Sequence, residues 1–265
     1  MDVGGKVVLV TGGGSGIGAG LAESFVERGA KVVITDINEE HAQAEAARLG
    51  VTALKHDVAS LESWNDVKRL VDAEFGHVDV LCNNAGVAQP FKPLDEIPPH
   101  EFARIIAINV TGVYNGAFTF MGEMKARRSG HIVNTSSVNG LVPHAPFAAY
   151  TASKFAVAGM SEALQLELSP HGVGVSILYP GLTRSRMSEG QMPGMSDEGT
   201  AALRARMMEP IWLGRAVVRA VENNQLHVIT HPAHKADIEA RMAVLYAAHG
   251  EPAQPGYQGG PIPKV

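Results

Sequence analysis

Short apolar runs alternate with longer amphipathic stretches along almost the whole chain. The runs are rich in Val, Ile and Leu, as expected of strands in a sheet that is covered on both faces. The predicted strands are residues 6–10, 31–35, 51–54, 78–81, 131–135, 173–178 and 226–229. The amphipathic stretches predict helices over residues 16–28, 39–49, 61–75, 98–125, 149–168 and 213–222. This alternation predicts a single α/β domain over residues 1–265, with a doubly wound parallel sheet flanked by helices on both faces.

Two segments depart from this alternation. Residues from about 184 to 212 are rich in Met, Gly, Glu and Arg and predict a lid over the domain. The segment from about 250 to 265 is rich in Pro and Gly and predicts an extended surface arm, a candidate for contact with a neighbouring subunit.

The composition narrows the classes of partner. The chain is 45% hydrophobic and 18% charged, with a formal net charge of -5 and a pI of about 6.1. This balance gives no basic footprint, so we expect neither nucleic acid nor a membrane as a partner. The first residues lack the zones of a signal peptide, and a lone cysteine, Cys82, excludes an internal disulfide framework. We therefore expect a cytoplasmic protein in which Cys82 is a small buried hydrophobic residue.

A glycine-rich segment joins the first predicted strand to the first predicted helix. Glycines permit a tight turn and let the backbone approach a pyrophosphate, whose charge then lies at the N-terminus of the helix. An ordinary turn also collects glycine, but this position favours the dinucleotide-binding loop of a Rossmann-like sheet. The candidate cofactor-binding residues in the loop are Gly12, Gly14, Ser15, Gly16, Ile17 and Gly18.

Asp36 follows the second predicted strand, at about the interval of 20 residues where an acidic residue accepts hydrogen bonds from the adenosine ribose. Its carboxylate would repel the 2′-phosphate of NADP, and the flanking positions Ser15 and Ile37 carry no charge to offset that repulsion. The sequence therefore predicts NAD as the cofactor. The alternative is an aspartate that only ends a strand or caps a helix.

Tyr150 and Lys154 lie four residues apart at the start of a predicted helix, so both side chains lie on one face. An ammonium about 4 Å from a phenol contributes roughly 4 kcal/mol at an effective dielectric near 20, on the order of three pKa units. We expect Lys154 to lower the pKa of Tyr150 into the range of effective acid–base catalysis. Taken alone, the pair also fits an exposed helix with a solvated lysine. However, Ser136 and Ser137 follow the strand 131–135, at the edge where such sheets bind ligands.

In their order along the chain, these motifs resemble those of the short-chain dehydrogenase/reductase family, single-domain type, from Gly5 to about Tyr246. The resemblance also rests on the motifs at residues 57–58, 83–86, 109–112 and 180–181. It implies that Ser137, whose spacing from Tyr150 is that of the family, is the catalytic serine, and that Asn109 holds a water linking Lys154 to solvent. The resemblance also implies cofactor contacts outside the glycine loop and Asp36. Asp57 and Val58 would lie at the adenine, and Asn83, Asn84, Ala85 and Gly86 at the adenosine ribose. Tyr150 and Lys154 would also contact the cofactor, and Pro180, Gly181, Thr183 and Ser185 would lie at the nicotinamide.

The last of these segments departs from the family pattern. The family usually carries an aliphatic residue and a threonine where this chain has Thr183 and Ser185, but the hydroxyl of Ser185 and the backbone of Thr183 are retained. The mechanism implied by the resemblance is unaffected. In the oxidative direction, Tyr150 accepts the alcohol proton, Ser137 steadies the carbonyl oxygen, and Lys154 lowers the tyrosine pKa and binds the nicotinamide ribose while NAD takes the hydride.

The substrate is predicted from the loops around this site. Their apolar, adaptable side chains favour a hydrophobic or aromatic secondary alcohol or ketone, although the methionines also fit packing of the lid onto the domain. Arg184, Arg186, Arg204 and Arg206 suit either an anionic substrate or a solvated surface. The candidate substrate residues are Ser137, Asn139, His144, Phe147, Tyr150, Tyr179, Met187 and Trp212.

Two alternative functions remain open: an NADPH-dependent keto or 3-oxoacyl reductase, and a catalytically silent NAD-binding interaction protein on the same fold. We predict no metal site, because no cysteine or carboxylate completes a ligand set with His227, His231 and His234. The resemblance implies a homotetramer or homodimer formed through the two long helices that contain Asn109 and Tyr150.

Overall fold

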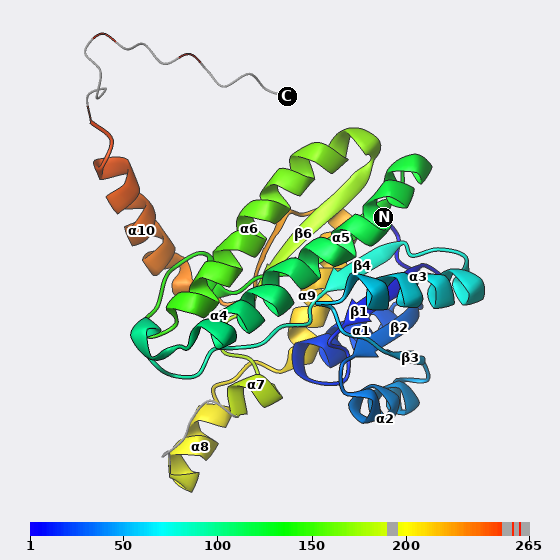
Figure 1. The fold of residues 1–265 in the computed structure, drawn as a ribbon, viewed down its shortest axis with the longest axis horizontal. Helices are drawn as coiled ribbons and strands as arrows, with labels where there is room; N and C mark the ends of the chain where they lie inside the picture. The colour runs from blue at the N-terminus through cyan, green and yellow to red at the C-terminus, as the bar shows by residue number, and fades with distance from the viewer. Residues whose placement is uncertain (190–195, 251–255, 257–259, 261–265) are drawn as a thin grey trace. The chain divides into compact units, whose positions relative to one another are not determined.

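The computed structural model describes residues 1–189, 196–250, 256 and 260, which form two compact units, residues 1–231 and residues 232–265. Within the described residues, the first unit contains a seven-stranded parallel sheet with the order β3-β2-β1-β4-β5-β6-β7 (Figure 1). Its strands are β1 (Val7–Thr11), β2 (Lys31–Asp36), β3 (Thr52–Lys55), β4 (Val80–Asn83), β5 (Gly130–Thr135), β6 (Val173–Tyr179) and β7 (His227–Ile229). This arrangement confirms the predicted doubly wound, Rossmann-like architecture.

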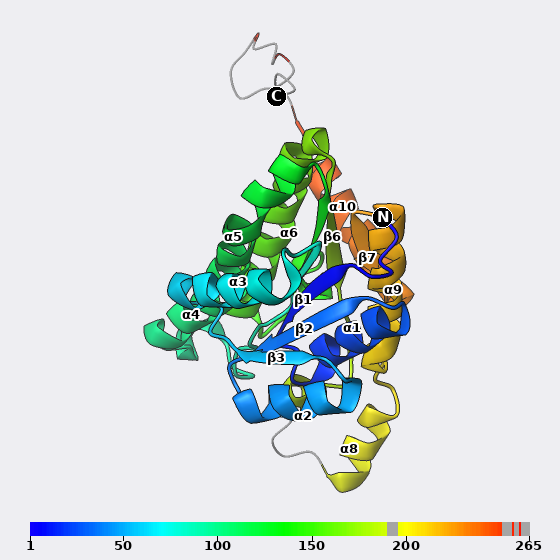
Figure 2. The same ribbon diagram turned by 90° about the vertical axis from the view of Figure 1, so that its right-hand side faces the viewer.

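Helices cover both faces of the sheet (Figure 2). Among the described residues, the α-helices of the first unit are α1 (Gly16–Glu27), α2 (Glu39–Leu49), α3 (Leu61–Phe75), α4 (Pro99–Ile106), α5 (Gly112–Arg127), α6 (Ala148–Leu168), α7 (Arg186–Glu189), α8 (Asp197–Arg204) and α9 (Pro210–Asn223). Successive residues of a strand point to opposite faces, so Val8 and Val10 pack under α1, α2 and α9, whereas Val7 and Leu9 pack under α3, α5 and α6. The buried thiol of Cys82 belongs to the first of these cores, which confirms its predicted role as a small hydrophobic residue.

The helix predicted over residues 98–125 is continuous from Pro99 to Arg127, but its middle, Ala107–Thr111, is a π-helical turn. Such turns occur frequently at functional sites. By length and composition alone this helix could cross a membrane, with a mean hydropathy of 1.2. Phe120 and Met124 on its inner face are buried in the core against the sheet, so we interpret it as a core helix.

The order of the strands places a candidate ligand site at one edge of the sheet. Connections from β1 run toward β3 on one side, and later strands run from β4 toward β7 on the other, so the topology switches between β1 and β4. Ligands bind at the carboxyl ends of the strands at such a point. The hydroxyl of Thr11, the last residue of β1, accepts hydrogen bonds from the backbone N–H groups of Asn84 and Ala85, each at 3.0 Å, and thereby joins the two loops that follow β1 and β4.

The second unit consists of a short 3-10 helix, Pro232–His234, and α10 (Lys235–Ala247). Most of the predicted arm, 250–265, lies outside the described residues, as does the part of the predicted lid from 190 to 195. The described part of the lid forms α7 and α8, which the sequence pattern did not predict.

Candidate active site

Tyr150, Lys154 and Ser137 lie together at the carboxyl edge of the sheet. Tyr150 and Lys154 lie in the first two turns of α6, and Ser137 follows β5 and is hydrogen-bonded to the Tyr150 side chain. The Lys154 side chain is buried, and its Nζ lies 5.5 Å from the centre of the Tyr150 ring. The same Nζ donates a hydrogen bond of 2.9 Å to the carbonyl oxygen of Thr135.

Burial controls the protonation of this pair. It raises the pKa of Tyr150, an effect that the hydrogen bond with Ser137 opposes, and it lowers the pKa of Lys154 to about 8. This corrects the expectation that Lys154 brings the pKa of Tyr150 toward neutrality. The cause is burial, which disfavours the charged phenolate, while the Lys154 ammonium donates its hydrogen bond to the Thr135 carbonyl.

The two serines after β5 have different partners. The Ser136 hydroxyl donates a 2.8 Å hydrogen bond to the backbone oxygen of Lys154 and so attaches α6, which carries Tyr150 and Lys154, to the sheet. The Ser137 hydroxyl accepts from the backbone of Asn139 at 3.2 Å and lies 3.4 Å from the Pro180 carbonyl oxygen. Ser137 is thus the serine that faces Tyr150.

Asn109 is buried in the π-helical turn, and its amide bonds in two directions. It accepts from the backbone N–H of Val87 at 2.8 Å and donates to the Val87 carbonyl at 2.9 Å. It also donates to the Ser153 hydroxyl at 3.0 Å, and that hydroxyl donates to the backbone oxygen of Tyr150 at 2.7 Å. The side chain therefore fixes the surroundings of the catalytic helix, and its expected role in holding a water stays a prediction.

The glycine loop makes a close backbone cradle at the start of α1. Gly12 and Gly16 have φ values of 65° and 53°, and a Cβ at Gly18 would lie 2.1 Å from the Gly12 carbonyl oxygen. Ser15 is the residue that precedes the helix, and Ile17 packs partly against the core. The loop thus brings bare backbone to the N-terminus of α1, which is the arrangement that binds a pyrophosphate in such sheets.

Asp36 lies beside this cradle. Its carboxylate accepts hydrogen bonds from the backbone N–H of Gly14 at 3.1 Å and of Asn38 at 3.0 Å. Arg186 of α7 contacts the imidazole of His41 in the first turn of α2, and a Cβ at Gly14 would lie 3.0 Å from both His41 and Asp36. A guanidinium therefore lies on the same side of the glycine loop as Asp36, where the sequence predicts no cation.

In the motif 83–86, the first residue lies in the core, and the other three lie near the glycine loop and Lys154. Asn83 is buried, and its amide donates to Asn134 Oδ1 at 2.9 Å inside the layer between the sheet and the helices. The side chain at the end of β4 therefore points into the core, and the predicted contact of the 83–86 turn with the adenosine ribose stays a prediction. Asn84 donates to the Thr11 carbonyl at 3.0 Å, Ala85 lies against Gly12, and a Cβ at Gly86 would lie 3.5 Å from Lys154 Nζ.

The predicted adenine contacts lie after β3. Asp57 is exposed and accepts from the backbone of Ala59 at 2.9 Å. Val58 is buried against Gly112, at the point where the π-helical turn meets α5. Gly112 therefore has no room for a side chain, since a Cβ would lie 2.9 Å from the Val58 side chain.

The segment that begins at Pro180 is fixed by a residue that the sequence analysis had not assigned to the site. His231 Nδ1 accepts from the Gly181 backbone at 3.0 Å, and its Nε2 lies 3.3 Å from the Leu182 carbonyl oxygen. Thr183 is buried and donates to the Gly181 carbonyl at 3.1 Å. Ser185 lies against Gly16, where a Cβ would be 2.8 Å from its own, so this segment crosses the start of α1.

The predicted substrate residues are not all brought together. Tyr179 is fully buried in the core, and its hydroxyl lies 3.2 Å from His227 Nδ1, so its side chain is not brought together with the other predicted substrate residues. Trp212 is 57% exposed and packs against Arg215. Met187 of the lid is 39% exposed, and Phe147 is half-buried beside α6. Asn139 lies 3.4 Å from the Thr151 hydroxyl, and His144 is exposed in the loop before α6.

The three histidines considered as metal ligands have other partners. His227 pairs with Tyr179, His231 with Gly181, and His234 lies 3.5 Å from Asp237. Among the described residues, no group of three or more His, Cys, Asp or Glu side chains is placed to hold a metal.

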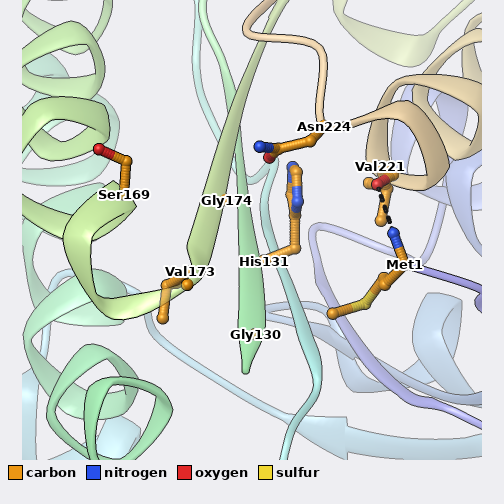
Figure 3. A pocket seen from close by; sticks show the side chains of 9 residues that line it. Met1, Gly130, His131, Ser169, Val173, Gly174, Val221 and Asn224 are labelled. Carbon is orange, nitrogen blue, oxygen red and sulfur yellow. Dashed lines mark hydrogen bonds between the residues drawn. The ribbon is translucent and has the colours of Figure 1, made fainter. Parts of the chain in front are cut away.

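A small cavity of about 170 Å³ lies at the opposite end of the sheet, where β5 and β6 begin (Figure 3). The buried His131 lines it, and its Nε2 lies 2.8 Å from the Ser176 hydroxyl. Burial lowers the pKa of His131 to about 3, so its ring is neutral there. This cavity is separate from Tyr150 and the glycine loop.

Comparison with known proteins shows the family. The short chain dehydrogenase model matches residues 6–195. A C alpha-dehydrogenase of Sphingobium sp. is 32% identical, over 91% of this chain and 85% of that protein, and a 3-alpha-(or 20-beta)-hydroxysteroid dehydrogenase of Mycobacterium tuberculosis is 37% identical, over 70% and 72%. A solved structure from Novosphingobium aromaticivorans, described as a short-chain dehydrogenase, has a TM-score of 0.86 and 33% identity, covering 97% of this chain and 91% of that one. This chain therefore belongs to the short-chain dehydrogenase/reductase family.

Proposed function

We propose that this protein is an NAD-dependent oxidoreductase that interconverts a secondary alcohol and a ketone. The observation that carries the proposal is the Tyr150 phenol, hydrogen-bonded to Ser137 beside the buried ammonium of Lys154, at the carboxyl edge of the sheet. In alcohol oxidation, the Tyr150 phenolate accepts the hydroxyl proton and becomes a neutral phenol, while the Ser137 hydroxyl donates to the substrate oxygen. Because burial raises the pKa of Tyr150, the positive charge of Lys154 is needed to stabilise the phenolate before it accepts the proton.

The residues at the sheet edge fit a nicotinamide dinucleotide. The glycine cradle, closed to side chains at Gly18, suits the pyrophosphate, and the Asp36 carboxylate suits the ribose hydroxyls of NAD. In the proposal, Gly181 to Ser185 and Lys154 would hold the nicotinamide end. When bound, the nicotinamide ring exchanges a hydride with the substrate carbon.

The proposed substrate is hydrophobic or aromatic. Phe91 and Phe147 lie edge to face with ring centres 5.5 Å apart beside the start of α6, and Met187 and Trp212 are exposed in or next to the lid. The dehydrogenase relatives include a hydroxysteroid dehydrogenase, whose name indicates a substrate of this chemical kind. We also propose that the described part of residues 184–212 covers the cofactor, since Ser185 and Arg186 contact the glycine loop and α2.

Self-association through α5 and α6 is a further part of the proposal. Tyr114 and Phe118 stack on each other, are 51% and 52% exposed, and lie on the outer face of α5, while Leu166 on α6 is 76% exposed. An apolar surface of this kind suits a second copy of the chain as a partner in a homodimer or homotetramer. The free thiol of Cys82 supports the reducing cytoplasm as the location.

The test is a screen for NADH formation with secondary alcohols, aryl alcohols, hydroxysteroids and sugars. We expect turnover with at least one apolar secondary alcohol, and we expect Tyr150→Phe to remove it while NADH binding, measured by fluorescence, persists. Tyr114→Phe is the matched control, because it makes the same change on the exposed face of α5. A fully active Tyr150→Phe enzyme would refute the proposed proton transfer.

A further inference from the structure

The side chain of Gln89 is 1% exposed and joins three segments around the catalytic helix. Its Oε1 accepts a 2.9 Å hydrogen bond from the backbone N–H of Tyr150. Its Nε2 donates to the carbonyl oxygen of Lys92 at 3.1 Å and to that of Pro146. One amide therefore contacts the start of α6, the loop that precedes it, and the loop that follows β4.

The contact with Tyr150 supplies what α6 lacks at its own start. The first N–H groups of a helix have no partner within it, and a side-chain oxygen at the residue before the helix usually accepts one of them. That residue here is Phe147, whose side chain makes no such bond. Gln89, which lies in the loop after β4, accepts a hydrogen bond from the first turn instead. The Tyr150 peptide is then held at both ends, because its carbonyl oxygen accepts from the Ser153 hydroxyl at 2.7 Å.

The contacts made by Nε2 hold the two loops beside Tyr150 at a fixed separation. Phe91 follows Gln89 closely in one loop, and its ring lies edge to face against Phe147 in the other. The side-chain amide of Gln89 thus connects the two loops that carry Phe91 and Phe147, the aromatic residues beside the proposed substrate site. The segment that carries Gln89 is itself fixed two residues earlier, where both backbone groups of Val87 bond to Asn109.

We propose that Gln89 is a positioning residue for the reaction: its carbonyl oxygen caps the catalytic helix at Tyr150, and its amide nitrogen holds the two substrate loops together. The effect on turnover rests on the proposed function, whereas the cap itself does not. A displacement of reacting groups by about 1 Å lowers turnover by about 100-fold, so a small shift of the first turn of α6 is sufficient to slow the reaction.

Two variants separate the two roles. Gln89→Met removes both the acceptor and the donors at nearly constant volume. We expect kcat to fall about 10- to 100-fold and the Tyr150 amide to exchange with solvent about fivefold to tenfold faster. Gln89→Glu keeps an acceptor at the positively polarised start of α6 but cannot donate to the two carbonyl oxygens. We expect it to keep the Tyr150 amide protected and kcat within about tenfold of the wild type, with a raised KM for the alcohol.

The matched control is Gln165→Met on the same helix. The side chain of Gln165 also accepts a backbone hydrogen bond, from Val175 at 2.9 Å, but it lies near the far end of α6. It should reduce stability without changing kcat or the exchange of Tyr150. Unchanged Tyr150 exchange in Gln89→Met would overturn the cap, and faster exchange with unchanged kcat would overturn the positioning role. A wild type without dehydrogenase activity, with exchange accelerated in Gln89→Met, would refute the proposed function and leave the cap supported.

Discussion

Replacing Asp36 by Asn tests the basis of the cofactor preference. The change removes one negative charge and keeps a side-chain oxygen that can accept from the backbone N–H of Gly14, now 3.1 Å from the carboxylate. We expect Asp36→Asn to use NADP far better than the wild type while its use of NAD falls only slightly. Asp36→Ala removes the oxygen as well, so it should weaken the use of NAD more than Asp36→Asn does and still relax the preference for NAD.

The size of the effect follows from the position of Asp36. Two unit charges about 4 Å apart interact by about 4 kcal/mol at an effective dielectric of 20. Asp36 is half-buried, so solvent screens part of this repulsion, and about 1.5 to 3 kcal/mol remains. That free energy corresponds to a decrease of about 10- to 100-fold in the ratio of kcat/KM for NAD to kcat/KM for NADP.

Arg186 gives the same experiment a second step. Its guanidinium contacts His41 on the same side of the glycine loop as Asp36. An exposed ion pair between Arg186 and the 2′-phosphate of NADP would contribute up to about 1 kcal/mol. Adding Arg186→Met to Asp36→Asn should therefore lower NADP use by about fivefold and leave NAD use unchanged.

The assay compares initial rates of formation of the two reduced cofactors at saturating alcohol. Glu40→Gln is the control, because it makes the same charge change on the exposed part of α2. An unchanged ratio in Asp36→Asn would show that the carboxylate does not select the cofactor.

Three other predictions concern titration, packing and assembly. Burial lowers the pKa of Lys154 from 10.5 to about 8, so between these values the unfolded chain binds more protons than the folded chain and stability rises with pH. Lys154→Met lacks this titrating group, so the difference between its free energy of unfolding and that of the wild type should narrow by about 2 kcal/mol from pH 7 to pH 9.5 in urea unfolding. A difference that does not change with pH would contradict the buried ammonium. Gly116→Ala would place a Cβ 2.2 Å from Asn83 Oδ1 and should cost about 1–3 kcal/mol in the same assay, whereas Gly122→Ala, with no atom within 4 Å, should stabilise α5 by about 0.5–1 kcal/mol; equal effects would refute the packing argument. Tyr114→Lys combined with Phe118→Asp should halve the mass measured by light scattering, while Leu70→Glu, an exposed apolar position on α3, should leave it unchanged; a wild type that is already monomeric would exclude the proposed interface.

The sequence was sufficient for the parts of the fold that depend on local pattern. The helix predicted over residues 61–75 is α3 (Leu61–Phe75) as found, and the catalytic helix begins one residue before the predicted start. Apolar periodicity reports such elements directly because each is buried along one face. The helix α8 in the lid is only eight residues long, which is too short for its apolar pattern to distinguish it from a loop within a segment rich in Gly and Met.

The parts of the site that were missed depend on contacts between distant segments. The π-helical turn at Asn109 is accompanied by bonds to Val87 and Ser153, and neither is visible in the local sequence. The family resemblance predicts the 83–86 turn at the ribose, and the loops around the site include Tyr179, but the side chains of both Asn83 and Tyr179 lie in the core, which local sequence does not reveal. Gln89 carries no sequence signal at all, since its role comes from a helix that begins far along the chain.

That separation has a consequence for how the enzyme acquires activity as it folds. Gln89 and Tyr150 are 61 residues apart in the chain, and Asn109 and Ser153 are 44 apart. Contacts that close such long loops form late, because chain entropy is lost before the contact stabilises the structure. The helix α6 can therefore form along its whole length before the hydrogen bonds of Gln89 and Asn109 hold its first turn in place. We expect turnover to return after helical content during refolding, so that activity reports the docking of the β4–β5 half of the sheet.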